Sequence, residues 1–223
     1  MISADIKRHE AVEPLDETHA IIQPCAGYRF GADAVALASF AADFIKREHR
    51  VFDMCSGCGI VGILVAIACG CAVDGAELDG ELWDMSVRSA AMNELDNVNF
   101  FNADIRDVSG FTKCGYDAVV CNPPYFKAGS VPSSVAPSAN SELSVTLRDV
   151  ISAAKYLLKP RGGLYLVYTS TRLDEAVTEC RDAGFAVKNI TVLGSGKTFL
   201  LRAVRGGKPG MTLNIRREKQ CSI

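Results

Sequence analysis

The sequence predicts an α/β protein with a doubly wound, mostly parallel sheet of seven strands that ends in an antiparallel hairpin. Short, continuously apolar runs alternate with helix-length segments between residues 50 and 183, as in a parallel sheet with helices on both faces. Only residues 194–198 separate the last two strand-like runs, and a link this short permits a hairpin but no crossover. Of the 223 residues, 48% are apolar and 22% charged, which suits one globular domain.

The first half of the chain sets up the alternation. Its first 20 residues are charged and weakly patterned, so we expect them to be extended or loosely packed. An Ala- and Leu-rich stretch predicts a helix over residues 33–46. There follow a strand (50–54), a tight turn (56–59), an apolar helix (60–69), a second strand (72–77), an amphipathic helix (81–95) and a third strand (98–102).

The second half continues with an apolar strand over residues 116–121. A Ser- and Pro-rich loop from residue 127 to residue 141 comes next, and loops of this length usually bind something or close over a site. The remaining predicted elements are two helices (146–158 and 172–183), the strand between them (163–168) and the two hairpin strands (185–193 and 199–204).

Charge and cysteine content set limits on the class of protein. The net charge of −2 does not by itself predict nucleic-acid binding, but local clusters of basic residues can still bind RNA. The candidates are Lys127, the group Arg202, Arg205 and Lys208, and the tail group Arg216, Arg217 and Lys219, each of which is equally well read as a solvated edge. Nine cysteines, several within apolar runs, and the lack of a signal-like or membrane-spanning stretch predict a reduced cytoplasmic protein.

Two local patterns look like ligand motifs and are set aside. Cys55-Ser-Gly-Cys58 has the spacing of half a zinc site, but all three histidines lie before residue 50 and no second ligand pair is evident. We therefore expect no metal. Gly194-Ser-Gly-Lys-Thr198 resembles a phosphate-binding loop, but that motif needs an earlier glycine, where this chain has Thr191, and must lead into a helix.

A glycine turn follows the first sheet strand. Asp53 is followed by Met-Cys-Ser-Gly-Cys-Gly, which opens directly into a helix, and glycines there let a ligand approach the helix N-terminus. Glu77 ends the next strand about 20 residues on, where a carboxylate can accept ribose hydroxyls. Asp104 follows the third strand and is either a contact to an adenine amino group or a turn cap. Together these residues predict a nucleoside-bearing cofactor.

The strand over residues 116–121 ends on Asn122-Pro-Pro-Tyr125. In an open α/β sheet this turn lies at the carboxyl edge, beside the glycine turn. Proline fixes φ and removes the N–H donor, so Asn122 and Pro123 present carbonyl acceptors with little freedom. The Asn122 side chain adds an amide oxygen, and Tyr125 offers a face for a flat ring. Such a turn is suited to holding an amino group.

These motifs resemble a known family. The Asp53–Gly59 turn, Glu77 and Asn-Pro-Pro-Tyr are similar to class I S-adenosylmethionine-dependent methyltransferases that act on nitrogen, which have a Rossmann-like fold. The stretch Gln23-Pro-Cys-Ala-Gly-Tyr-Arg-Phe-Gly31 resembles the opening of the bacterial family that methylates the N6 amine of an adenine in valine tRNA, beside the anticodon. The resemblance implies an N-terminal segment (1–30) that lines the cofactor pocket and a methyltransferase domain (31–223).

The resemblance also implies roles for individual residues. The turn would hold the methionine part of S-adenosylmethionine, Glu77 its ribose and Asp104 its adenine. The implied catalytic residues are Asn122, Pro123, Pro124 and Tyr125; the implied cofactor-binding residues are Tyr28, Arg29, Phe30, Gly31, Asp53, Ser56, Gly57, Gly59, Glu77, Leu78, Asp104, Ile105 and Asn122. Arg29 would meet the cofactor's carboxylate, unless it is an ordinary surface arginine.

The chain departs from the family at Cys55, where glycine is usual, and at Ala32, where many relatives have Thr or Ser. A cysteine at position 55 is tolerable if its φ is negative. Three other functions stay open from the sequence: methylation of a glutamine in a protein such as a release factor, methylation of guanine N2 in RNA, and a cofactor-binding module without catalysis. The oligomeric state is also open.

Overall fold

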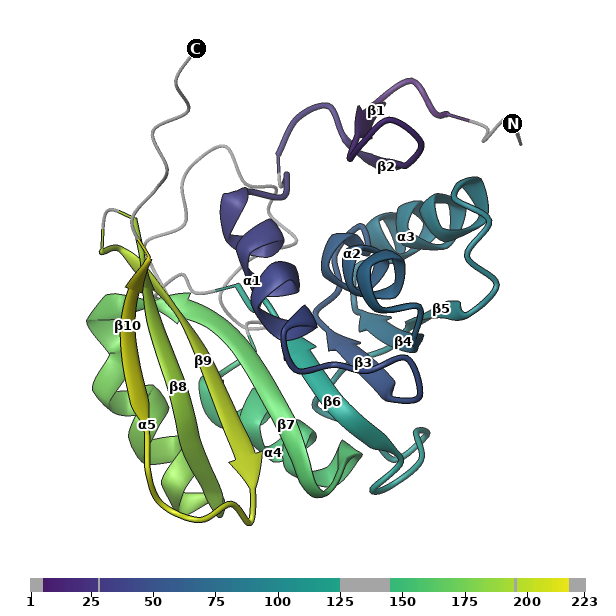
Figure 1. Cartoon of the computed structure of the whole chain (residues 1–223). Coiled ribbons are helices and arrows are strands. Elements are labelled where there is room, and N and C mark those ends of the chain that lie inside the picture. The colour runs from purple at the N-terminus through teal and green to yellow at the C-terminus, as the bar shows by residue number, and fades with distance from the viewer. Residues whose placement is uncertain (1–5, 28, 125–144, 195, 217–223) are drawn as a thin grey trace.

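The computed structural model describes residues 6–27, 29–124, 145–194 and 196–216. Its main sheet has eight strands in the order β10-β8-β9-β7-β6-β3-β4-β5, and a separate hairpin pairs β1 with β2 (Figure 1). The strands are β1 (Glu10–Pro14), β2 (Ala20–Pro24), β3 (Arg50–Met54), β4 (Ala72–Glu77), β5 (Val98–Asn102), β6 (Tyr116–Cys121), β7 (Leu158–Thr169), β8 (Phe185–Leu193), β9 (Thr198–Arg205) and β10 (Thr212–Arg216). The helices are α1 (Ala32–Ala42), α2 (Ile60–Cys69), α3 (Gly80–Met92), α4 (Leu147–Leu157) and α5 (Leu173–Asp182).

The predicted α/β architecture is confirmed. Strands β3, β4, β5, β6 and β7 pair in parallel, while β9 lies between β7 and β8 and is antiparallel to both. The prediction of seven strands is short by one, because β10 pairs in parallel with β8 at the edge of the sheet. Its side chains are all exposed, so the strand has no buried face to produce a recognisable apolar pattern.

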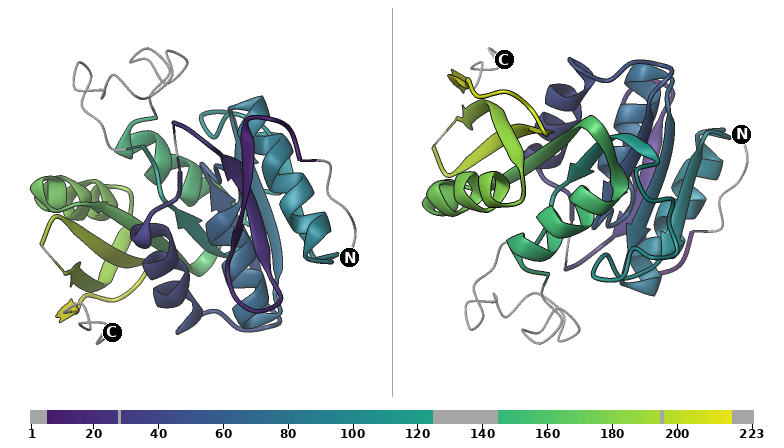
Figure 2. Two further views of the ribbon diagram at one scale, coloured as in Figure 1. Left: turned by 90° about the horizontal axis from the view of Figure 1, so that it is seen from above. Right: turned by 90° about the horizontal axis from the view of Figure 1, so that it is seen from below.

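Helices cover both faces of the sheet (Figure 2). Helices α1, α2 and α3 pack on one face, where α2 is apolar almost throughout and has four buried branched side chains. Helices α4 and α5 pack on the other face. Helix α4 begins with a capping box in which Thr146 and Asp149 satisfy each other's backbone N–H groups. The two cores fix the strands so that the carboxyl ends of β3, β4 and β6 lie at one edge.

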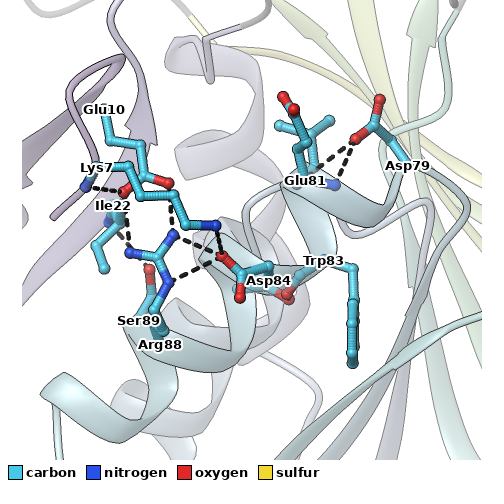
Figure 3. A network of polar contacts seen from close by, with 11 residues as sticks. Lys7, Glu10, Ile22, Asp79, Glu81, Trp83, Asp84, Arg88 and Ser89 are labelled. Carbon is cyan, nitrogen blue, oxygen red and sulfur yellow. Dashed lines mark hydrogen bonds and ion pairs between the residues drawn. The ribbon is translucent and has the colours of Figure 1, made fainter. Parts of the chain in front are cut away.

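Among the described N-terminal residues, β1 is extended, as predicted, and contacts fix it to the rest of the domain. Glu10 at the start of β1 is buried, and Arg88 of α3 donates hydrogen bonds to both of its carboxylate oxygens at 2.9 and 2.5 Å. Arg88 also pairs with Asp84 at 2.8 Å, and Lys7 pairs with Asp84 at 2.7 Å (Figure 3). An ionic network therefore fastens the chain before and within β1 to α3. A sequence pattern misses it because the partners are far apart in the chain.

Strand β2 of the hairpin adds neutral contacts to α3. The Ile22 N–H donates to the hydroxyl of Ser89 at 2.9 Å (Figure 3). Asn93 brackets Ala20, accepting from its N–H at 2.9 Å and donating to its carbonyl at 2.7 Å. Ile21 and Ile22 are fully buried. The hairpin is thus part of the domain's core, and it leads the chain toward α1 at the end of the molecule to which β3 and β6 run (Figure 1).

Candidate functional site

The turn between β3 and α2 is organised around a buried carboxylate. Asp53 is 1% exposed, and its Oδ2 accepts a hydrogen bond from the N–H of Gly62 at 2.8 Å. A side chain at position 62 would begin 3.0 Å from that same oxygen. Gly62 therefore lets the first turn of α2 approach Asp53 closely, and the positive end of the helix stabilises the negative charge.

Two of the turn's three left-handed positions are occupied by glycine. Gly57 has φ of 55° and Gly59 has φ of 88°. A Cβ at Gly59 would lie 2.8 Å from the ring of Phe100 and 2.9 Å from Cβ of Ser86, so both conformation and space require glycine there. Cys55 also has a positive φ, 55°. The condition under which a cysteine is easily tolerated at this position is thus not met, and the turn stores backbone strain.

Glu77 lies at the carboxyl end of β4, next to the turn. Its Oε2 accepts from the N–H of Gly57 at 2.8 Å and its Oε1 from the N–H of Asp79 at 2.9 Å. Burial raises the pKa of Glu77 despite these bonds. Burial also raises the pKa of Asp53 to about 7, the nearby negative charge of Glu77 adds to this, and the bond from Gly62 opposes it. The two acids form a site that favours a positively charged or hydroxyl-rich ligand.

Two buried oxygens of this turn have no hydrogen-bond partner among the described residues. They are Oδ1 of Asp53 and the hydroxyl of Ser56. Buried polar atoms are nearly always satisfied, so an unsatisfied pair at one site is consistent with a polar ligand. An ammonium group and ribose hydroxyls, as S-adenosylmethionine carries, supply the donors that these acceptors need. The residues at the turn therefore fit that cofactor.

Strand pairing brings the second motif to this turn. β3 and β6 are parallel neighbours in which Met54 pairs with Cys121. The next residues, Cys55 and Asn122, therefore leave the sheet side by side. Chain order also reverses here, since β4 and β5 extend the sheet on one side of β3 and β6 lies on the other, which is where open α/β sheets bind ligands. Asn122 is half-buried, Pro123 buried and Pro124 exposed.

Burial affects two thiols close to the site, those of Cys58 and Cys121. Burial raises the pKa of Cys58 to about 12. Burial and then the neighbouring Cys55 thiol raise the pKa of Cys121. Protonated thiols are poor nucleophiles and poor metal ligands. The part of the chain that the structure describes contains no cluster of three or more His, Cys, Asp or Glu suited to a metal ion.

Asp104, for which the sequence left a ligand contact and a turn cap as alternatives, has a local partner. Arg106 binds both of its carboxylate oxygens, with Nη2 to Oδ2 at 2.5 Å, and the Arg106 N–H donates to Oδ1 at 2.9 Å. The side-chain bond from Arg106 lowers the pKa of Asp104. Ile105 is buried in the α4-side core, whereas Leu78 is exposed. Of these three predicted cofactor contacts, only Leu78 presents an open side chain.

The structure describes most of the Gln23–Gly31 stretch. Tyr28 and Tyr125 lie outside the described residues. Arg29 is exposed and pairs with Glu13 of β1 at 2.9 Å. Phe30 packs against the α1-side core, and Gly31 precedes α1 with an extended backbone. Arg29 thus meets a hairpin carboxylate, as an ordinary surface arginine does, and still has further guanidinium donors.

Two site residues escape sequence reasoning. Gly62 supplies the N–H to Asp53, and its signal was a glycine inside an otherwise strongly apolar helix. Asn102, at the end of β5, donates from its amide to the carbonyls of Glu77 and Leu78 at 2.9 and 3.0 Å. It holds the loop that carries Glu77. Its signal was an amide at the tip of a strand next to β4.

Comparison with known proteins agrees with this geometry. A family model for the methyltransferase small domain matches residues 33–181. A protein of Aeromonas salmonicida named tRNA1(Val) (adenine(37)-N6)-methyltransferase is 28% identical over 151 residues, which cover 66% of this chain and 62% of the relative. A protein of the same name from Cytophaga hutchinsonii is 25% identical over 171 residues, covering 70% of this chain and 66% of the relative. The chain therefore spans about 62% of the length of the Aeromonas relative.

Solved structures support the fold alone. A predicted O-methyltransferase from Agrobacterium tumefaciens superposes with a TM-score of 0.66 at 21% identity, covering 85% of this chain and 89% of that one. TYW2 from M. jannaschii, in complex with AdoMet, gives a TM-score of 0.63 at 16% identity, covering 89% and 86%. With the glycine turn, its acids and the match over residues 33–181, the chain belongs to the methyltransferase small domain family.

Proposed function

We propose that the protein is an S-adenosylmethionine-dependent N-methyltransferase that methylates the N6 amine of an adenine in tRNA. The observation that carries the proposal is the parallel pairing of β3 with β6. Because Met54 pairs with Cys121, the glycine turn and Asn122-Pro-Pro begin side by side at the ends of these strands. The names of the relatives from Aeromonas salmonicida and Cytophaga hutchinsonii support valine tRNA as the substrate. A tRNA substrate implies a cytoplasmic protein.

The cofactor would be held mainly by groups at the ends of β3 and β4. S-adenosylmethionine supplies an activated methyl group on its sulfonium. Asp53 and Ser56 would accept hydrogen bonds from the methionine part, and the second lone pairs of the Glu77 carboxylate would accept from the ribose. Residues 1–30 would close the pocket over the turn, with 31–223 as the methyltransferase domain. For Asp104 to reach the adenine, Arg106 would first have to release it.

The target amine would be held by the turn after β6. The lone pair of an adenine amine is delocalised into the ring, so it must become more tetrahedral before it attacks a methyl group. Acceptors on Asn122 and Pro123 would favour that geometry and hold the amine in a fixed orientation, which is catalysis by positioning. Moving a base out of its stack costs a few kcal/mol. Tyr125, as a stacking face, would offset about 1–3 kcal/mol of it.

The proposal is tested with unfractionated tRNA from cells that lack this protein. The chain and labelled S-adenosylmethionine should produce N6-methyladenosine, detected by mass spectrometry of the nucleosides. Asn122→Ala should lower the turnover at least about a hundredfold and leave cofactor binding unchanged in calorimetry. Asn99→Ala, an exposed amide on β5, is the matched control and should behave as wild type.

Other outcomes of the same assay would reject the proposal. N2-methylguanosine in place of N6-methyladenosine would assign a different base. Label transferred to a release factor but not to tRNA would assign a protein glutamine as the substrate. Cofactor binding without transfer to either substrate would leave a non-catalytic binding module. Loss of cofactor binding in Asn122→Ala would show that Asn122 acts on the cofactor and not on the target amine.

A further inference from the structure

One face of the sheet carries a charged cavity far from the glycine turn. Among the described helices, α4 and α5 cover one face of this half of the sheet, and none lies over the opposite face of β8 and β10 (Figure 1). On that open face is a shallow cavity of about 300 Å³. It is lined by Arg161, Lys188, Arg202, Val204, Gly207 and Lys208. Four of these six residues are cationic.

The side chains of Arg161 and Lys188 both point to the loop between β9 and β10. Arg161 lies in an irregular stretch at the start of β7 with φ of 71°, and its side chain donates to the carbonyl of Gly206, just past the end of β9, at 3.1 Å. Lys188 of β8 reaches the carbonyl of Lys208 at 3.3 Å. Both bonds end on the loop between β9 and β10, so residues from three strands (β7, β8 and β9) and this loop surround one cavity.

Arg202 lines the cavity from β9. Its guanidinium lies over the ring of Phe44, 4.3 Å from the centroid, and Tyr165 and Asn189 are its polar partners. Its Nε is buried and has no hydrogen-bond partner among the described residues. Packing thus fixes this cation, and one of its donors is unsatisfied among the described residues.

No acid among the described residues forms an ion pair with these cations. Within the part of the chain that the structure describes, no carboxylate lies within 4.0 Å of the charged groups of Arg161, Lys188, Arg202 or Lys208. Their hydrogen bonds to the carbonyls of Gly206 and Lys208 leave the positive charge uncompensated. In a chain with a net charge of −2, four uncompensated cations in one cavity form a local site for a polyanion.

We propose that this cavity binds phosphates of the tRNA backbone, away from the nucleotide that is modified. The inference rests on the proposed function, since it takes tRNA as the substrate. Arg161 is five residues before Leu166, which pairs with Cys121 at the end of β6, and five residues of strand span roughly 17 Å at about 3.3 Å per residue. An RNA that fills both sites would therefore run along the open face of the sheet. Contacts to phosphates position such a ligand without reading its sequence.

Arg205 shows that sequence proximity alone does not define this site. It is three residues from Arg202 and three from Lys208, but its guanidinium donates to the carbonyl of Leu158 and contacts the thiol of Cys114. It thus lies on the other side of β9 and helps to hold the start of β7. The cluster predicted from the sequence divides into cavity residues and a structural arginine.

The test compares tRNA binding by the wild-type chain and by a triple variant, Arg161→Gln, Lys188→Gln and Lys208→Gln. Arg202 is kept because it packs against Phe44. The dissociation constant for unfractionated tRNA is measured by fluorescence anisotropy at several salt concentrations. The triple variant should bind about tenfold more weakly, and the slope of log K against log salt should fall by about 1 for each cation removed. Binding of S-adenosylmethionine should be unchanged.

A control triple variant changes the net charge equally on the other face. It carries Lys113→Gln, Lys155→Gln and Arg181→Gln, all exposed and on or beside α4 and α5, and it should bind tRNA as wild type does. Equal affinities and salt slopes for the cavity variant and wild type, with methylation intact, would overturn the cavity and leave the proposed function standing. Wild type that binds tRNA through the cavity but methylates no RNA would support the cavity and reject the function. Binding of phosphatidylserine vesicles in preference to tRNA would reject RNA as the partner.

Discussion

Two groups of acids on the same side of the sheet differ in their partners and in the direction of their pKa shifts. Glu10 and Asp84, where the hairpin meets α3, are paired with Arg88 and Lys7 (Figure 3). Burial raises the pKa of Glu10, but the bonds from Arg88 and the Lys7 N–H outweigh it and the net pKa is lowered. At the glycine turn, the donors to Asp53 and Glu77 among the described residues are backbone N–H groups, and burial raises the pKa of both acids.

The difference separates structural acids from functional ones. An acid that is paired with a cation of the same chain stabilises the fold, and its carboxylate is then no longer free to bind a positively charged ligand. An acid buried without a cation destabilises the folded state, and the cost is recovered when a positively charged ligand arrives. Loss of a structural acid should therefore lower stability, while loss of a functional one should lower affinity and leave stability equal or higher.

The largest expected effect is on cofactor binding. Asp53→Asn keeps an oxygen for the Gly62 N–H but removes the negative charge, and a charge-assisted hydrogen bond contributes roughly 1.5–3 kcal/mol. We expect the affinity for S-adenosylmethionine to fall about ten- to a hundredfold in calorimetry. Glu10→Gln, at the structural acid, should leave that affinity within about threefold of wild type. An unchanged affinity in Asp53→Asn would remove the distinction between the two groups.

The pH dependence of the same variant sharpens the contrast. Asp53 has a pKa of about 7 in the folded state against 3.8 for an ordinary aspartate. The folded chain therefore binds more protons between these values, and stability falls as pH rises from about 4 to 7. Asp53→Asn lacks this dependence, so it should match wild type at pH 4 and be more stable at pH 8 in urea unfolding. Wild-type cofactor affinity should rise between pH 6 and 8, and that of the variant should stay flat.

The next largest effect is expected on stability, when the ion pair between Arg88 and Glu10 is broken. Arg88→Met leaves Glu10 buried without its partner and should lower the free energy of unfolding by about 2–3 kcal/mol. Arg148→Met removes an exposed pair with Glu179 and should cost less than about 1 kcal/mol. Because the pKa of Glu10 is lowered, the contribution of the pair is present above about pH 4.5 and is lost as the pH falls further. Equal losses for the two variants at pH 7 would show that the hairpin network is not structural.

The smallest expected effect is on backbone strain, which is found at the turn and not in the described part of the hairpin. Cys55 has φ of 55°, and left-handed backbone costs a residue with a Cβ about 1 kcal/mol. Cys55→Gly should therefore be about 1 kcal/mol more stable than Cys55→Ala, which removes the thiol and keeps the strain. Thermal unfolding of the two variants measures this difference. A more stable alanine variant would mean that the turn is not strained.

How far the sequence predicts this molecule depends on how local each signal is. The bounds of β3, β4, β5, β6 and α2 agree with the predictions, because apolar runs and glycine punctuation report on the elements directly. The burial of Glu10 depends on Arg88, 78 residues away, and leaves no local trace. Asp104 shows a second limit, since an acid at a strand end reads the same whether it meets a ligand or, as here, Arg106.

The position of β9 also has a consequence for how the chain is made. β8 precedes β9 in the chain but reaches β7 only through it, so a growing chain that ends at Leu193 gives β8 no sheet partner and leaves β7 with an open edge. Exposed edges of this kind invite aggregation. The last third of the sheet can form only after Arg205 has been added, and a product truncated before β9 should be a target for chaperones and proteases although its glycine turn and Asn122 are complete.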